Sequence, residues 1–324
     1  MEPFSELIEM RRRFVMEWVE QKEVKKEKIY NLFRCTYVEV REWLKETDVV
    51  IIPLGSTEQH GKHCPVCTDS IATELPCQLA AEIANVPFVQ LMPIGYSPQH
   101  LHPAGIGSGT ITFSSSTYQN IIYEMGRCLI HNGFNKLIYA TGHTSNMKVI
   151  DPAMRALRYE TNAFICCVRN DAEAVPALYG DQGIIECPPE EAPGWHGSEV
   201  EASECLYFEQ LYGKKIVHID RATKDYTHAP KWATDVSKKF TKNNGSPYLT
   251  MNGKDIAWVP MEHQEYSDNG LIGYPGNPFV ATAEKGKKLV NAKAKLMAEF
   301  IEEVKKFKVE VKNREYWNRT YRPF

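Results

Sequence analysis

The amino-acid sequence predicts an α/β protein in which helices cover both faces of a central, mostly parallel sheet. Short apolar stretches alternate with longer amphipathic stretches along most of the chain, as they do in repeated β-α units. The apolar stretches lack polar alternation, which is typical of strands buried on both faces. The 324 residues can bury a large core. No linker or repeat is evident, so we expect a single domain over residues 1–324.

The predicted strands are the apolar runs themselves. The segment "VVIIPL" lies within the first strand and "LIYAT" within the fourth. The five predicted strands span residues 48–55, 87–96, 110–113, 135–143 and 163–169. A loop rich in glycine, serine and proline joins the second strand to the third.

The stretches between these runs have helical periodicity. Asp69 or Ser70 lies near the N-cap of one helix, and Asn132-Gly133 closes the next. The predicted helices span residues 4–31, 37–45, 69–84, 117–132, 146–161 and 281–308. Residues 1–45 are therefore predicted as an N-terminal helical extension, and residues 281–324 as a C-terminal helix and tail.

Composition argues against several classes of partner. The formal net charge is −3, which gives no electrostatic reason to expect nucleic acid or an anionic membrane as a partner. The first residues carry acids and no apolar signal region, and no apolar run reaches the roughly 20 residues that cross a bilayer. The 9 cysteines are irregularly spaced and odd in number, as in a protein with reduced thiols. We therefore expect a cytoplasmic protein.

Potential metal ligands follow three of the predicted strands. Glu58 and His60 come after the first strand, His100 and His102 after the second, and His143 ends the fourth. The carboxyl ends of parallel strands lie at one edge of a sheet, so these side chains are expected to meet there. The later segment "GWHGSEVEAS" adds three more candidates, which are His196, Glu199 and Glu201.

Mixed carboxylates and imidazoles favour a site for divalent Zn, Mn or Fe. With Asp69 and one of the later glutamates, the donors suffice for two ions if one carboxylate bridges them, and such a pair activates a water molecule. The competing interpretation is that these histidines are hydrogen-bonded loop residues. Cys64 and Cys67 suggest a structural zinc site, but no second well-spaced pair exists, so packing is the better explanation for them.

Three segments resemble the signatures of the creatininase (creatinine amidohydrolase) family. They are "PLGSTEQHGKHCPVCTD" (53–69), "TGHTSN" (141–146) and "GWHGSEVEAS" (194–203). Family members usually have G-S-x-E-Q-H-G-P-H-L-P-L-x-T-D, then N-G-H-G-G-N, then H-x-G-x-x-E-T-S. The resemblance implies a three-layer α/β sandwich, two divalent metal ions per chain and a homohexamer.

The resemblance also implies roles for individual residues. Four of them fall on metal ligands, with Asp69 as the bridge: Glu58, His60, Asp69 and His143. Creatininase has a further carboxylate at the position of Ser145, so we expect a later glutamate to replace it, Glu199 in preference to Glu201. His196 corresponds to the acid/base that protonates the leaving group.

The substrate side of the site departs from the family pattern. A family loop usually begins S-x-E-H, whereas this chain has Gln99 in place of the glutamate. His100 in that loop and Ser145 are expected to border the substrate. Trp195 is expected either to stack on a flat or cyclic substrate or to pack in the core.

These features predict a metal-dependent hydrolase that opens or deacylates a small polar cyclic substrate at a non-peptide C–N bond. The alternative within enzymes is hydrolysis of a C–C bond in a cyclitol ketone, as by 3-dehydro-scyllo-inosose hydrolase. An alternative from another class is an oligomeric small-molecule-binding protein without turnover.

Overall fold

The computed structural model describes residues 28–170, 183–188, 194, 196–222, 240–242, 248–260 and 277–318. Most of the helix predicted over residues 4–31 therefore lies outside the described residues. The part of the extension that is described contains a short 3-10 helix, η1 (Leu32–Arg34), and the helix α2 (Tyr37–Glu46), which confirms the helix predicted over 37–45.

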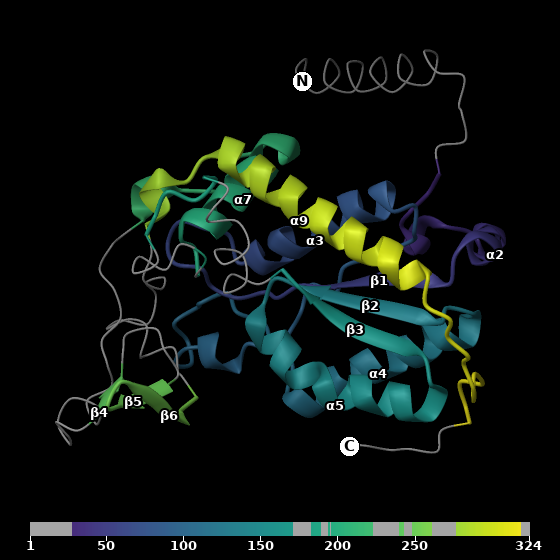
Figure 1. Ribbon diagram of the computed structural model, residues 1–324. Helices are drawn as coiled ribbons and strands as arrows, with labels where there is room; N and C mark the ends of the chain where they lie inside the picture. Colours follow the sequence, from purple (N-terminus) through teal and green to yellow (C-terminus); the bar gives the residue numbers. More distant parts are fainter. Residues whose placement is uncertain are drawn as a thin grey trace, which may run out of the picture.

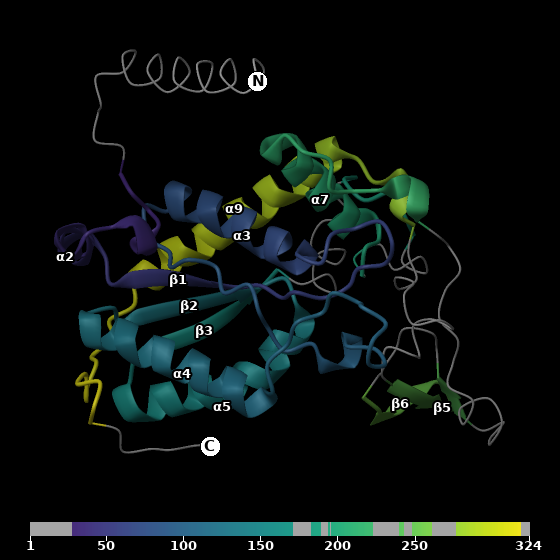
Figure 2. The same cartoon turned by 180° about the vertical axis from the view of Figure 1, so that it is seen from behind.

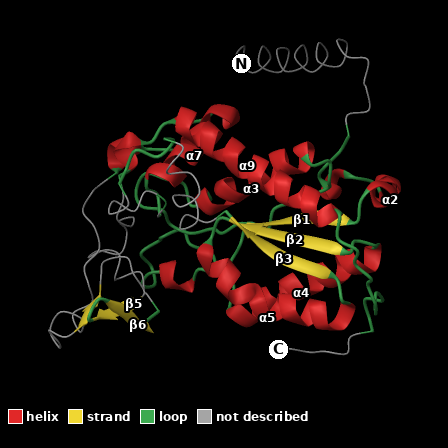
Figure 3. Ribbon diagram, in the orientation of Figure 1, coloured by secondary structure: helices red, strands yellow, loops and turns green. Residues whose placement is uncertain are grey.

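The centre of the fold is a parallel sheet of three strands (Figure 3). They lie in the order β1 (Val49–Leu54), β2 (Lys136–Thr141) and β3 (Phe164–Arg169). Val49 pairs with Lys136, and Lys136 pairs with Phe164, so the strands begin at the same level and also end together. All three strands were predicted. Their carboxyl ends form one edge of the sheet, as the prediction of a site at that edge requires.

Helices cover both faces of this sheet (Figures 1 and 2). One layer contains α4 (Ser115–Asn132) and α5 (Thr144–Thr161). The other contains α3 (Thr68–Ile83) and α9 (Ala283–Lys305), with α7 (Glu199–Tyr212) packed against both helices. The result is the predicted three-layer α/β sandwich with a mostly parallel sheet.

The alternation of side chains along the strands explains why both faces are buried. Val50 and Ile52 of β1 join the core beneath α4 and α5, whereas Val49 and Ile51 join the core beneath α3 and α9. None of these four side chains is exposed to solvent. Because successive residues point to opposite faces, a strand between two helical layers must be apolar throughout.

Two predicted strands are less regular than expected. Residues 87–96 pair with β1 only through single bridges, Phe88 to Ile51 and Met92 to Leu54. The strand predicted over 110–113 is a single bridge between Ile111 and Thr57. A small antiparallel sheet was not predicted: β4 (Phe240–Lys242), β5 (Tyr248–Met251) and β6 (Lys254–Trp258). It lies apart from the main sheet (Figure 1).

Asn146 joins the segments that end at the site edge. Its Nδ2 donates to the carbonyl of Gly55 after β1 (2.9 Å), and its Oδ1 accepts from the amide of Tyr96 (2.9 Å). The approach is so close that a Cβ on Gly95 would lie 2.4 Å from Asn146 Oδ1, which explains the glycine there. One fully buried amide therefore holds the loop after β1, the 87–96 segment and α5 together.

We expect Asn146→Ala to lower the free energy of unfolding by about 2–4 kcal/mol, because it leaves two buried backbone groups without partners at roughly 1–3 kcal/mol each. Denaturant unfolding followed by circular dichroism measures this. Asn120→Ala on the exposed side of α4 is the control, and its effect should stay within about 0.5 kcal/mol. Equal losses for the two variants would contradict the role of Asn146.

Candidate metal centre

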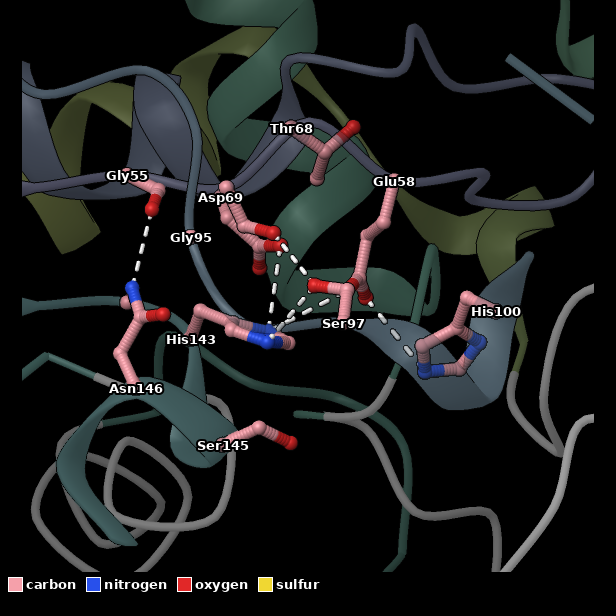
Figure 4. Close-up of polar contacts among 12 residues, drawn as sticks. Gly55, Glu58, Thr68, Asp69, Gly95, Ser97, His100, His143, Ser145 and Asn146 are labelled. Atoms are coloured by element: carbon pink, nitrogen blue, oxygen red, sulfur yellow. Dashed lines mark hydrogen bonds and ion pairs between the residues drawn. The ribbon is translucent and has the colours of Figure 1, made fainter. Parts of the chain in front are cut away.

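Five ionisable side chains meet at the carboxyl edge of the sheet, and Figure 4 shows three of them, Glu58, Asp69 and His143. They are Glu58 and His60 after β1, Asp69 in the first turn of α3, His143 before α5, and Glu201 in the first turn of α7. None is more than 6% exposed. Burial of three carboxylates side by side is unfavourable unless positive charge compensates them.

His143 is held in the orientation of a metal ligand. Its Nε2 lies 3.0 Å from the carbonyl oxygen of Tyr96 and 3.0 Å from the hydroxyl of Ser97. Because a carbonyl can only accept, Nε2 carries the proton and Nδ1 keeps its lone pair. That lone pair faces Glu58 Oε2 at 3.3 Å and Asp69 Oδ2 at 3.4 Å.

His60 is oriented in the same way through its other nitrogen. Its Nδ1 lies 3.1 Å from the carbonyl oxygen of Glu58, so Nδ1 donates the proton. Its Nε2 therefore has the free lone pair, which faces Glu201 Oε2 at 3.5 Å and Asp69 Oδ1 at 3.6 Å. A backbone carbonyl that fixes the tautomer of a histidine is the usual support of a metal ligand.

The donor atoms are spaced like ligands rather than like hydrogen-bonded pairs. Separations of 3.3 to 3.6 Å exceed ordinary hydrogen bonds. They match the ~3.4 Å expected between two ligands of one tetrahedral ion with bonds of about 2.1 Å. Three of the buried atoms have no hydrogen-bond partner, namely Glu58 Oε2, His60 Nε2 and Asp69 Oδ2. The residues present therefore fit divalent metal.

Among the described residues, three groups of donors lie close enough together to hold an ion; the third consists of Glu58, His60 and His196, and the other two share Asp69. The first consists of Glu58, Asp69 and His143, and the second of His60, Asp69 and Glu201. Each group offers three protein ligands, which leaves a position for water or substrate. Asp69 turns one oxygen towards each histidine, as the sequence-based expectation of a bridging carboxylate requires.

The structure corrects the choice between the two later glutamates. Glu201 lies at the cluster, whereas Glu199 points away from it. Both oxygens of Glu199 are occupied: Oε1 accepts from Lys285 Nζ (2.7 Å) and the amide of Glu186 (2.8 Å), and Oε2 accepts from the amide of Cys187 (2.8 Å). Two positions along a helix are about 200° apart, so only one of the pair can face the site.

The electrostatic environment separates these two glutamates as well. Burial raises the pKa of Glu201 to about 7, which nearby Asp69 reinforces and His60 opposes. Burial also acts to raise the pKa of Glu199, but the bonds from Lys285 and the two amides outweigh it, so this pKa lies below its ordinary value. Glu199 is thus a charged carboxylate whose two oxygens both accept hydrogen bonds, and its bond from Lys285 joins α7 to α9.

The turn before α7 is fixed to the first loop through Gly197. The amide of Gly197 donates to Glu201 Oε2 (2.6 Å), and its carbonyl accepts from His63 Nε2 (2.6 Å). Gly197 has a φ of +74°, and a Cβ there would lie 3.0 Å from the ring of His63. Glycine is therefore required, because it combines a left-handed backbone with close approach. Sequence reasoning did not assign this role to His63.

His196 lies at the edge of the cluster. Its ring stacks on His60 at a centroid distance of 4.2 Å and on His100 at 4.7 Å. Its Nδ1 lies 3.4 Å from Glu58 Oε1, and its side chain is 11% exposed, against 1% for His60. It is thus the more accessible of these two imidazoles.

The remaining candidates differ in their position. His100 Nε2 lies 3.7 Å from Glu58 Oε1, so it borders the cluster. Ser145 lies beside His143 (Figure 4) and accepts a bond from Gln99 Nε2 (3.0 Å). Trp195 lies outside the described residues. Cys64 and Cys67 belong to an apolar cluster with Ile71 and Cys205, in agreement with packing rather than metal binding.

The orientation of His143 depends on two serines that the sequence alone did not indicate. Ser97 Oγ lies 2.6 Å from Ser56 Oγ as well as 3.0 Å from His143 Nε2. Thr73 gives further support, since its hydroxyl donates to the carbonyl of Asp69 (2.7 Å) and accepts from the amide of Gly142 (2.7 Å). The loop after β1, the end of β2 and the start of α3 are thereby fixed relative to one another.

Known proteins resemble this chain over most of its length. Residues 34–301 match the family described as creatininase, creatinine amidohydrolase. The chain is 28% identical over 268 residues to the 3-dehydro-scyllo-inosose hydrolase of Thermotoga maritima, a match that covers 79% of this chain and 78% of that relative. It is 27% identical over 132 residues to the mycofactocin precursor peptide peptidase of Mycolicibacterium smegmatis, covering 39% of this chain and 52% of the peptidase.

Solved creatininases share the fold. One described as a manganese form has a TM-score of 0.61 and 22% identity, covering 86% of this chain and 100% of that chain. A Zn–Zn form of a mutant creatininase has a TM-score of 0.60 and 22% identity, covering 87% of this chain and 100% of that chain.

We expect Glu201→Gln to weaken binding of divalent ions at least about tenfold, because it removes an anionic ligand, whereas Glu199→Gln should leave the ions bound. The two changes are matched, since each replaces one buried glutamate of the same helix by its amide. Metal content after dialysis against a weak chelator measures both. Loss of metal from Glu199→Gln with retention in Glu201→Gln would reverse the assignment.

We also expect zinc binding to weaken as the pH falls below about 7 and to release protons. In the metal-free protein the pKa of Glu201 is raised to about 7 by burial. Burial opposes the charged form of His60 and His143, but the neighbouring carboxylates raise the pKa of both. Ions and protons thus compete for the same atoms, and a higher pH favours the ion.

Calorimetric titration of zinc in buffers of different ionisation enthalpy counts the released protons. Glu201→Gln is the control, since it should release fewer protons than the unmodified protein. Heats that do not depend on the buffer would contradict the expectation.

Proposed function

The chain belongs to the creatininase family of metal-dependent hydrolases, and we propose that it uses two divalent ions to hydrolyse a small, polar cyclic substrate at a ring carbonyl. The main support is the sharing of Asp69 between two groups of buried donors at ligand spacing. When bound, two such ions lower the pKa of a water between them and polarise a carbonyl oxygen.

The residues around the ions have distinct tasks in this proposal. Asp69 would hold both ions, Glu58 with His143 would complete the ligand set of one ion, and His60 with Glu201 would complete that of the other. His196 donates a proton to the leaving atom, because it borders the cluster and retains access to solvent. For a cyclic amide, the oxygen of water adds to the carbonyl carbon and the C–N bond breaks with its electron pair on nitrogen, which His196 protonates.

A second candidate reaction is hydrolysis of a C–C bond in a cyclitol ketone. It is supported by the relative from Thermotoga maritima, whose match extends over 79% of this chain, whereas the peptidase match covers 39%. Water adds to one ring carbonyl and the bond to the adjacent carbon breaks. The electron pair becomes an enolate of a second carbonyl, which His196 protonates, so the product is an open-chain keto acid.

Zinc, manganese and iron all suit the donor set. The solved creatininases of the same fold are described as manganese and Zn–Zn forms, so we propose one or both of these metals here. No helix among the described residues has the length and apolar composition to cross a bilayer. Cytoplasmic location, a homohexamer and the absence of nucleic-acid partners stay predictions.

Product analysis tests the proposed reaction. The protein reconstituted with zinc or manganese is incubated with cyclic amides and with a cyclitol diketone, and the products are identified by mass spectrometry. We expect one class to be opened with uptake of one water. Asp69→Ala, which removes the shared ligand, should lose both metal equivalents and turnover. Turnover that persists in metal-free Asp69→Ala would refute the metal-dependent mechanism.

A further inference from the structure

Gln99 and Ser145 form a neutral polar pair beside the metal centre. Ser145 lies two residues after His143, in the first turn of α5. Gln99 lies in the 3-10 helix η2 (Pro98–His100), between Ser97, which contacts His143, and His100, which faces Glu58. Both elements that present the pair are therefore fixed to metal ligands, and Ser145 lies close to His143 in Figure 4.

The hydrogen-bonding capacity of this pair is only partly used. Gln99 Nε2 donates to Ser145 Oγ at 3.0 Å, which leaves the hydroxyl proton of Ser145, the second amide proton of Gln99 and the amide oxygen of Gln99. Within the described part of the chain, neither side chain makes another hydrogen bond. Both are partly exposed, so a substrate can reach them. The pair thus offers donors beside an acceptor and carries no charge.

A hydroxyl group both donates and accepts through a single oxygen, so it can bond to a donor and an acceptor of this pair together. A ring nitrogen that carries a positive charge would instead favour a carboxylate, and neither position provides one. We propose that Gln99 and Ser145 bind a hydroxyl on the ring carbon next to the reacting carbonyl, and that the substrate is a neutral, polyhydroxylated cyclic ketone. This inference rests on the proposed hydrolytic function and selects among its substrates.

The test compares two ligands that differ in one hydroxyl. A polyhydroxylated cyclohexanone and its analogue deoxygenated next to the carbonyl are titrated into the zinc-loaded protein by calorimetry. We expect Ser145→Ala to weaken binding of the hydroxylated ketone by roughly 3- to 10-fold and to leave binding of the deoxy analogue unchanged. Ser145→Thr, which keeps a hydroxyl, should restore the preference. Metal content should be the same in all variants.

Ser115→Ala serves as the matched control, because Ser115 is an exposed serine in the first turn of α4. The corresponding pair of cyclitol diketones, with and without that hydroxyl, is used in the hydrolysis assay. The ratio of kcat/KM for the hydroxylated diketone to kcat/KM for the deoxy diketone should fall in Ser145→Ala by a similar factor.

The outcomes separate this inference from the proposed function. If Ser145→Ala affects both ligands equally, or neither, or if neither ligand binds, the hydroxyl subsite is wrong even where cyclic amides are hydrolysed. If binding depends on the hydroxyl through Ser145 but no ring is opened, the subsite stands and the hydrolytic function fails.

Discussion

Burial of three carboxylates against two imidazoles at one edge of the sheet is the constraint that governs this structure. Glu58, Asp69 and Glu201 are each at most 4% exposed, and their mutual repulsion would be unfavourable without positive charge between them. Two histidines with raised pKa values compensate them in the metal-free state. Divalent ions compensate them better, because they bond directly to the oxygens that have no other partner.

The surrounding elements serve to hold these donors in place. Parallel strands bring the loops after β1 and β2 to the same edge, and Asn146 ties the loop after β1 to α5. Thr73 connects α3 to the end of β2, and His63 connects the first loop to the turn before α7. Because hydrogen bonds already hold these ligand side chains in position, they need to move little when an ion binds.

The two glutamates at the start of α7 face different surroundings: one lies at the donor cluster, and the other stabilises the packing of helices. Glu201 faces the cluster, where its burial keeps the pKa high until an ion binds. Glu199 faces α9, where Lys285 and two backbone amides stabilise its charge. The buried ion pair of Glu204 with Lys293 adds a second tie between the helices at 2.5 Å. The position of Glu201 therefore depends on contacts made by its neighbours on the opposite face.

The sequence by itself determined the alternation of strands and helices, because strands buried on both faces must be apolar throughout, and "VVIIPL" is such a run. It also determined which side chains follow the strands, and parallel pairing then brings Glu58, Asp69 and His143 together. Only the tertiary structure decided between Glu199 and Glu201, since the rotation of α7 depends on Lys285, which lies 86 residues away in the sequence. The irregular pairing of residues 87–96 and the bond from Gln99 to Ser145 likewise follow from packing between distant segments, which local periodicity does not encode.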